Sequence, residues 1–199
     1  MKLPKTSLIA FIFLFVASQT HAQIRFPVTN NDLRNNLQKV IADFPNGLND
    51  IKGDVTSRNP QTIEYTTLLK FDGAEENTIT QYISAKPIYS WQAVLLTTED
   101  FEEATKKYKW LCNQLKVMTI KMGDGYTFSL NGNYEAPTES KDFNTSTFKL
   151  TPAATYLPKM KIEVGMQFYF PEWKVSLTVY QKEREDNERG DINDDAPNP

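Results

Sequence analysis

Apolar residues recur with helical spacing near the beginning of the chain. Between Thr29 and Phe44 they fall at positions i, i+4, i+7, i+8 and i+11, which is a single stripe along a helix. Thr29 and Asp32 have the spacing of a capping box, with Asp in the place of Glu, and Pro45 and Gly47 are residues that end helices. The pattern predicts a helix over this range. Its apolar stripe consists of Leu33, Leu37, Val40, Ile41 and Phe44.

A second helical stripe runs from about Glu99 to Lys116. Its apolar positions are Phe101, Ala104, Tyr108, Leu111, Cys112 and Leu115. Thr97 and Asp100 repeat the capping spacing, and acidic residues in the first turn suit the helix dipole. Because Cys112 lies in the apolar stripe, we expect its thiol to be buried and inert.

Alternation of apolar and polar residues predicts strands over most of the remaining chain. The strand-like runs are 63–71, 78–85, 91–97, 117–122, 126–130, 144–150, 161–170 and 173–181. Residues 46–61 contain two glycines and a proline and are expected to form a loop. The run 93–96 is apolar at every position, which predicts a strand that is covered on both faces.

The last two runs predict a hairpin that turns at Pro171 and Glu172. Alternation then places apolar side chains on one face and polar ones on the other, and a slip of one residue would bury the polar set. The expected apolar pairs are Phe170 with Trp173, Phe168 with Val175, Met166 with Leu177, and Val164 with Val179. The expected pairs on the other face are Tyr169 with Lys174, Gln167 with Ser176, and Glu163 with Tyr180.

These elements predict an α+β fold, a mostly antiparallel β-sheet with two amphipathic helices packed on it. Each half of the chain reads as a helix followed by strands. Each half also ends on a strand that opens with tryptophan, at Trp91 and Trp173. This weak repeat raises the hypothesis of a duplicated α-βββ unit.

Residues 1–22 have the three parts of a cleavable signal peptide. Lys2 and Lys5 precede an apolar segment from Leu8 to Ala17, and Ala22 supplies the small residue before the expected cleavage. The apolar segment is shorter than the roughly twenty residues of a spanning helix. We therefore expect a chain that begins at Gln23, works in the periplasm or is secreted, and has no membrane span after cleavage.

Charge divides the rest of the chain into two parts. The whole sequence has 22 basic and 25 acidic residues. Residues 182–199 are acidic and are expected to be a disordered tail, which leaves residues 23–181 as a single α+β domain. No basic stripe is present, so nucleic acid is not an expected partner.

The expected mature chain lacks histidine. The single histidine is His21, inside the predicted signal peptide, and the single cysteine is Cys112. Without histidine the chain lacks the commonest acid–base catalyst and a Cys/His zinc site. We therefore predict a non-enzymatic protein without catalytic residues, metal or cofactor.

A carboxylate pair is the catalytic alternative, since glycoside hydrolases need no histidine. The candidate acids are Glu64, Glu135, Glu139, Glu163 and Glu172. Sequence alone does not bring any two of them together. An aromatic platform for sugars or peptides is the binding alternative to core packing. Its candidates are Tyr65, Tyr82, Tyr169, Tyr180, Trp91 and Trp173.

Three further motifs have simpler explanations. The Gly-Asp-Gly sequence at 123–125 lies between two predicted strands and is expected to be a hairpin turn. Ser146 and Lys149 match an S-x-x-K motif, but residues three apart on a strand point to opposite faces. The calcium-like spacing of Asp191, Asn193 and Asp195 lacks the glycine and glutamate of a calcium loop.

Three stretches carry a resemblance to a known group of proteins. They are TTEDFEEATKKYKWLCNQLK, which follows the strand that opens at Trp91, then NYEAPTESKDF and EWKVSLTVYQKEREDNERGD. These stretches resemble small exported proteins of Bacteroidota, a family without an established activity. The resemblance implies export and an α+β domain, and it transfers no functional residues.

The leading expectation is an exported, non-enzymatic protein that binds a protein or glycan ligand. One alternative is a carboxylate-dependent glycan hydrolase, which requires two acids that converge in a cleft. The other is a periplasmic chaperone or assembly factor, which requires an exposed apolar face and dimerisation. The binding protein requires an exposed aromatic patch without such an acid pair.

Overall fold

The structure, a computed structural model, describes residues 30–181 except 85–86, 124, 155–156 and 158. The predicted signal peptide 1–22, the cap at Thr29, the tail 182–199 and its calcium-like motif lie outside the described residues. The helical elements are α1 (Asn30–Asp43), a 3₁₀ turn η1 (Phe44–Asn46) and α2 (Phe101–Lys116). The strands are β1 (Lys52–Arg58), β2 (Thr62–Thr67), β3 (Glu76–Tyr82), β4 (Ile88–Thr98), β5 (Thr119–Lys121), β6 (Thr127–Gly132), β7 (Phe143–Thr151), β8 (Met160–Tyr169) and β9 (Glu172–Gln181).

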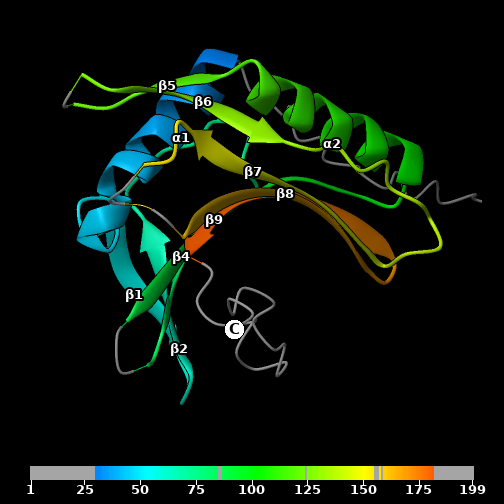
Figure 1. Cartoon of the computed structure of the whole chain (residues 1–199). Helices are drawn as coiled ribbons and strands as arrows, with labels where there is room; N and C mark the ends of the chain where they lie inside the picture. Colours follow the sequence, from blue (N-terminus) through cyan, green and yellow to red (C-terminus); the bar gives the residue numbers. More distant parts are fainter. Residues whose placement is uncertain (1–29, 85–86, 124, 155–156, 158, 182–199) are drawn as a thin grey trace, which may run out of the picture.

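All nine described strands form one sheet, in which every neighbouring pair is antiparallel. Their order is β1-β2-β3-β4-β9-β8-β7-β6-β5, so two meanders meet where β4 pairs with β9. In Figure 1, β8 and β9 bend into an arch, and both helices lie on its outer side. The mostly antiparallel α+β fold with two helices is therefore confirmed.

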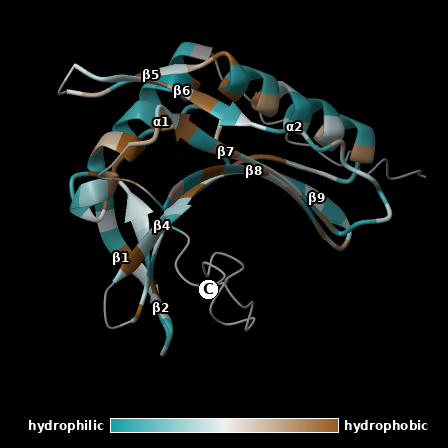
Figure 2. Ribbon diagram, viewed as in Figure 1, coloured by the Kyte–Doolittle hydropathy of each residue, from teal (hydrophilic) through white to brown (hydrophobic). Residues whose placement is uncertain are grey.

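The core lies between the helices and the outer face of the sheet. The apolar stripes of both helices face the core as predicted, with Leu33, Tyr108 and Leu111 fully inaccessible to solvent and Phe101 half-buried. Strands β8 and β9 contribute their alternate apolar residues, among them Val164 and Leu177. Figure 2 shows the resulting alternation of brown and paler or teal positions along these strands. Each strand thus keeps one polar face away from the core.

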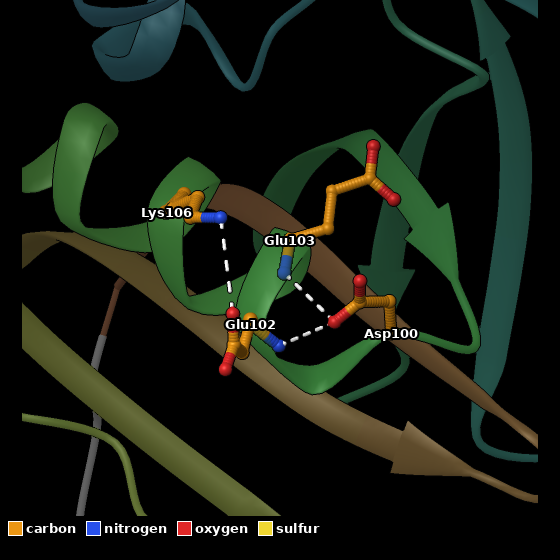
Figure 3. Close-up of polar contacts among 4 residues, drawn as sticks. All are labelled: Asp100, Glu102, Glu103 and Lys106. Atoms are coloured by element: carbon orange, nitrogen blue, oxygen red, sulfur yellow. Dashed lines mark hydrogen bonds and ion pairs between the residues drawn. The ribbon is translucent and has the colours of Figure 1, made fainter.

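The first turn of α2 differs from the prediction. The N-cap is Asp100, not Thr97, and the helix begins at Phe101. The Asp100 carboxylate accepts hydrogen bonds from the backbone N–H groups of Glu102 (2.7 Å) and Glu103 (3.2 Å), as Figure 3 shows. Asp100 satisfies two backbone donors that the first turn of a helix leaves unpaired, whereas Thr97 continues β4. Glu102 and Lys106, one helical turn apart, form an ion pair at 3.9 Å.

The register of the β8–β9 hairpin is also corrected. Tyr169 pairs with Glu172, so Phe170 and Pro171 form the turn, and Phe170 is 91% exposed. Every predicted pair is therefore displaced by two residues. The observed apolar pairs are Phe168 with Trp173, Met166 with Val175, Val164 with Leu177, and Ile162 with Val179. A shift of two residues preserves the faces, because side chains on a strand alternate with period two.

One other strand prediction needs correction. Strand β1 lies within the segment 46–61 that was expected to be a loop. It is an edge strand with mostly exposed polar residues, so it lacks the alternation that predicts a strand.

The apolar run 93–96 is buried at every position, as expected for a strand covered on both faces. The register with β9 shifts between Val94 and Leu96, which returns Leu96 to the core face. Val94 lies on the opposite face and is 5% exposed.

Candidate functional site

The inner face of the arch carries the polar side chains of the central strands. On β9 these are Lys174, Ser176, Thr178 and Tyr180, which alternate with the buried residues of the core. The neighbouring strands continue the face, because Thr178 pairs with Gln92 on β4 and with Glu163 on β8. We call this surface of β3, β4, β9, β8 and β7 the concave face. It is the side of the sheet away from the helices (Figure 1).

A hollow of about 510 Å³ lies on the concave face. This volume is within the range of roughly 300–1,000 Å³ that small-ligand sites occupy. Short side chains of β9 line its middle, with Ser176 and Thr178 at the floor. Tyr82 lines it from β3 and Phe143 from β7. The hollow thus crosses strands from both halves of the chain.

The depth of the hollow depends on a glycine. Gly165 pairs with Ser176 across β8 and β9. A Cβ atom at Gly165 would lie 3.2 Å from the Ser176 hydroxyl and 3.9 Å from the Phe143 ring. The missing side chain therefore leaves room above the floor and lets the Phe143 ring come close to it.

Polar side chains in the hollow are already held in place by one another. The Tyr180 hydroxyl donates to the Glu163 carboxylate at 3.1 Å, which links diagonal neighbours on β9 and β8. The Gln92 amide donates to the Thr178 hydroxyl at 3.4 Å. These contacts orient one carboxylate and one amide toward the same strip of β9, and such orientation lowers the entropy cost of binding.

A smaller hollow of about 290 Å³ adjoins the first and shares Gln92, Gln167 and Ser176 with it. Lys174 lines this end, and its ammonium group lies 3.2 Å from the Glu76 carboxylate. The pair reaches across β4, which lies between β3 and β9, and each charge offsets the other. The two hollows together make a continuous groove along β9.

The six aromatic candidates separate into two groups. Trp91 and Trp173 are core residues, 0% and 4% exposed, as the core-packing interpretation predicts. Tyr82 and Tyr180 line the larger hollow and Tyr169 lines the smaller one.

The remaining aromatic candidate, Tyr65, lies on another part of the sheet. Its hydroxyl donates to Gln81, and its ring centroid is 5.1 Å from the ammonium nitrogen of Lys52. That nitrogen is also 5.0 Å from the ring centroid of Tyr89, which lines the larger hollow. Burial, and then the neighbouring Tyr65, raises the pKa of Tyr89. The Tyr89 phenol therefore stays protonated at neutral pH.

The structure distributes the candidate acids over the molecule. Glu163 is the only one of the five that lines the groove, and Glu135 lines a separate hollow beside β6 and β7. Glu64, Glu139 and Glu172 line none of these three hollows. No pair from this set is brought together in one hollow.

A buried polar cluster lies on the core side of β7. The hydroxyls of Tyr108 and Ser146 are 2.7 Å apart, and Ser146 also accepts a hydrogen bond from the Glu135 backbone at 3.0 Å. Ser146 is 1% exposed while Lys149 is exposed, so the S-x-x-K residues point to opposite faces as expected. The cluster attaches α2 and the segment after β6 to the sheet.

Cys112 lies next to this cluster and is fully buried. Burial raises the pKa of its thiol to about 11, although the Ser146 hydrogen bond opposes the shift. A thiol with this pKa is protonated at neutral pH and is a poor nucleophile. The expectation of a buried cysteine is confirmed.

Two observations concern the described residues alone. Their acidic and cysteine side chains include no group of three that could hold a metal ion. Neither of the two helices is long and apolar enough to cross a membrane. Gly123 and Gly125 lie between β5 and β6, where Gly125 has a φ of 86° and its N–H donates to the backbone carbonyl of Met122. A hairpin turn was the expectation for that segment.

The fold and the groove together define a class of protein: an α+β protein with one antiparallel sheet, helices on the outer face, and a polar, aromatic-edged groove on the inner face. Comparison of the chain with protein-family models, with curated proteins and with solved structures gives no match. We therefore infer the function from the geometry of the groove.

Sequence reasoning missed several residues of the groove, including Gln92, Gly165 and Phe143. The sequence contains part of the pattern that marks these residues. The polar positions of the predicted strand 173–181 form a complete second face, which has the pattern of an ordinary solvated surface until the strand order is known. Small residues in the middle of that face, such as Ser176, are the feature that marks a hollow.

Proposed function

We propose that this chain is an exported, non-enzymatic binding protein whose ligand lies in the groove of the concave face. The observation that carries the proposal is the asymmetry of the sheet. One face is filled by the apolar stripes of α1 and α2. On the other, a hollow of about 510 Å³ contains oriented polar groups and exposed aromatic edges.

The ligand that suits this groove is extended and polar. Among the described residues, hydroxyl and amide side chains line the larger hollow beside the acid Glu163. In the smaller hollow, Lys174 and Glu76 form an ion pair. Because hydroxyl and amide groups can both donate and accept hydrogen bonds, a ligand with polar groups along its length has partners throughout the groove.

The acid positions favour binding over glycan hydrolysis. Glu163 and Glu76 are the acids that line the two joined hollows. They lie on β8 and β3, with β4 and β9 between them. The Glu163 carboxylate accepts from Tyr180 and the Glu76 carboxylate pairs with Lys174. Tyr180 and Lys174 lie about 20 Å apart along β9. Catalytic carboxyl pairs lie roughly 5–9.5 Å apart. Release of reducing ends from a neutral glycan, lost in Glu163→Gln, would instead establish the hydrolase.

The exposed apolar residues give less support to a chaperone. They lie in separate parts of the sheet: Phe143, Tyr169 and Phe170 near the β8–β9 turn, Tyr82 and Ile83 at the end of β3, Val117 and Tyr126 near β5 and β6, and Val55 and Leu68 near β1 and β2. Apolar groups so dispersed do not make the contiguous patch that a chaperone needs for an unfolded client.

Export is part of the proposal and is supported by the sequence of residues 1–22. An intact-mass measurement on protein from the native envelope tests it. A mass that begins at Gln23 is expected. Retention of residues 1–22 would contradict export by signal cleavage.

We also propose that the groove lies between two related halves. A helix precedes each meander, and the last strands of the two meanders, β4 and β9, pair at the centre. Trp91 opposite Val179 and Trp173 opposite Thr98 occupy corresponding places on the core face. In an experimental structure, superposition of β4 on β9 should also superpose β3 on β8. Failure of the second pair to follow would contradict duplication.

A fragment screen tests the binding site without knowledge of the natural ligand. The probes are small water-soluble fragments, charged and uncharged, added to the ¹⁵N-labelled chain. We expect amide shifts to cluster at Gln92, Ser176 and Thr178. Ser176→Trp should abolish the cluster by filling the space above Gly165, while Asn113→Trp on the outside of α2 should preserve it. Shifts that cluster on the helices, or that survive Ser176→Trp, would overturn the proposal.

A further inference from the structure

We infer that a second copy of this chain docks head-to-tail on it, with the β8–β9 turn of one copy against the C-terminal half of α2 of the next. The inference is independent of the groove and of its ligand. Three features carry it: an exposed aromatic tip among acidic side chains, a basic surface with exposed apolar residues, and the placement of the two at opposite ends of the molecule.

The β8–β9 turn presents an exposed aromatic ring. Phe170 is 91% exposed, although the turn residues of hairpins are usually small or polar. Its ring centroid lies 6.3 Å from that of Phe168, which in turn lies 4.9 Å from that of Trp173. These contacts connect the tip to the core and hold the ring outside it. Exposed aromatic rings add little to folding and are enriched in protein interfaces.

Acidic side chains surround this ring. The first turn of α2 begins beside it, because the Phe101 ring centroid lies 5.2 Å from that of Trp173, and Figure 3 shows the acids of that turn. Among the described residues of this end, the acids are Glu76, Glu99, Asp100, Glu102, Glu103, Glu139, Asp142 and Glu172, and the lysines are Lys106, Lys141 and Lys174. Acids thus outnumber lysines. We call Phe170 and these side chains the acidic tip.

The chain after the first turn of α2 has the opposite charge. Residues 104–122 contain five lysines and no acid. Two of these lysines already interact with acids at the other end, Lys106 with Glu102 and Lys107 with Glu75. The excess positive charge therefore belongs to the other three, which are Lys109, Lys116 and Lys121.

Apolar side chains accompany these lysines on the outside of α2. Val117, the C-cap, is 79% exposed, and Trp110 is half-buried. The two are seven residues apart, which places them on the same side of the helix. Lys109 and Lys116 have the same spacing and flank the apolar pair. We call Lys109, Trp110, Lys116 and Val117 the basic surface.

Two acids lie near the basic surface without cancelling its charge. Glu135 follows Tyr134, whose ring centroid lies 5.8 Å from the Lys116 ammonium nitrogen, but Glu135 shares a hollow with Lys149. Asp124 follows Lys121 in the sequence and lies outside the described residues. Three lysines and this one acid leave a net positive charge.

The acidic tip and the basic surface lie at opposite ends of α2. Figure 1 shows the β8–β9 turn beside the start of this helix and β5 beside its end. A helix of 16 residues is about 24 Å long, so one chain cannot join its own two surfaces. Contact between two tips, or between two basic surfaces, would bring like charges together. The tip of one copy against the basic surface of the next avoids this repulsion, and such a contact is heterologous.

The helix dipole explains only part of this pattern. Acids near the start of a helix and lysines near its end are favourable in any helix. The dipole gives no reason for an exposed Phe170 and an exposed Val117, because apolar side chains do not interact with it. Contact between copies explains both the charges and the exposed apolar residues.

Sedimentation velocity on the protein recovered from the native envelope tests the inference. The two surfaces are small, so we expect weak association that develops between about 10 µM and about 1 mM protein. The weight-average mass should rise beyond that of a dimer, since each added copy leaves one surface free at either end. Association should weaken at about 0.5 M salt, which screens the charges.

Two variants each remove one of the surfaces. Phe170→Ser and Val117→Ser should each weaken association at least about tenfold. When the two variants are mixed, they should form dimers and nothing larger, because each contributes one intact surface and the two remaining surfaces are defective. Leu68→Ser is the matched control, since Leu68 is 67% exposed between β2 and β3, and should leave association unchanged. A circular dichroism melt verifies that each variant is folded.

The inference is wrong if the protein stays monomeric at about 1 mM, if its association stops at a dimer, or if the mixed variants form no dimer. It is also wrong if Leu68→Ser weakens association as much as Phe170→Ser does. Two further results would assign the basic surface to another occupant and reject a second copy. One is association that requires residues 182–199 and not Phe170. The other is binding to anionic vesicles, abolished by Val117→Ser, without any self-association.

Discussion

At the scale of single residues, side-chain size decides where the concave face is hollow. Gly165, Ser176 and Thr178 lie where β9 passes between longer side chains of β4 and β8. A larger residue at any of them would reduce the space, and Gly165 is the tightest, since its absent Cβ would lie 3.2 Å from the Ser176 hydroxyl. These small residues can be read from the sequence, but the sequence alone does not show that they are neighbours.

Burial should make Cys112 unreactive in the folded chain. Its thiol is fully buried with a pKa of about 11, compared with an ordinary value of 9.0. We expect thiol reagents to label it slowly at neutral pH without denaturant and rapidly after unfolding. Fast stoichiometric labelling of the folded chain would contradict the packing of α2.

The same pKa shift gives Cys112 a definite effect on stability against pH. Below about pH 9 the thiol is protonated in both states, so its contribution to the free energy of unfolding is constant. Between about pH 9 and 11 the unfolded chain loses the proton first, and the free energy of unfolding falls. Cys112→Ala should flatten part of this fall, measured by urea denaturation across that range.

Trp173 should be a major contributor to stability. It is 4% exposed, and its ring centroid lies 4.9 Å from that of Phe168 and 5.2 Å from that of Phe101. Trp173→Ala should lower the free energy of unfolding by about 3–5 kcal/mol, because it leaves a cavity where α2 meets the sheet. Tyr169→Ala, at an exposed position of the same hairpin, should cost less than about 0.5 kcal/mol. A loss below about 1 kcal/mol for Trp173→Ala would place its ring outside the core.

At the scale of elements, periodicity predicts which residues share a face. It does not determine the register between strands or reveal a strand without a buried face. Alternation on β8 and β9 correctly separates core from groove residues, yet the pairing differs by two residues from the prediction. The turn decides between these registers, and Phe170 and Pro171 occupy it. Strand β1 was not predicted, because it pairs with one neighbour only and has no buried face that would require alternating apolar residues.

The cap of α2 is an element-scale feature with a measurable energy. Asp100→Ala should lower the free energy of unfolding by about 0.5–2 kcal/mol, since two backbone N–H groups lose their acceptor. Asp100→Asn should retain most of the stability, because its side-chain oxygen can still accept. Thr97→Ala tests the sequence-based alternative. If it costs more than Asp100→Ala in chemical denaturation, the helix begins earlier than the structure places it.

At the scale of the whole molecule, strand order creates the groove. Strands β3 and β4 precede α2, whereas β8 and β9 end the described chain, and the pairing of β4 with β9 brings them together. The class of fold and most core positions follow from periodicity, since each depends on local spacing. The groove does not, because its lining comes from segments that only the order of strands makes adjacent.

Hydroxyl-radical footprinting tests the central claim, that the concave face is the binding surface, most directly. The full chain is oxidised with and without the fragment that gives the largest amide shifts at Ser176 and Thr178, and side-chain oxidation is measured by mass spectrometry. The account predicts that the ligand protects Tyr82 and Phe143 and leaves Tyr126 unchanged, since only the first two line the groove. Equal oxidation of Tyr82 and Phe143 with and without ligand, or protection confined to α2 and Tyr126, would contradict it.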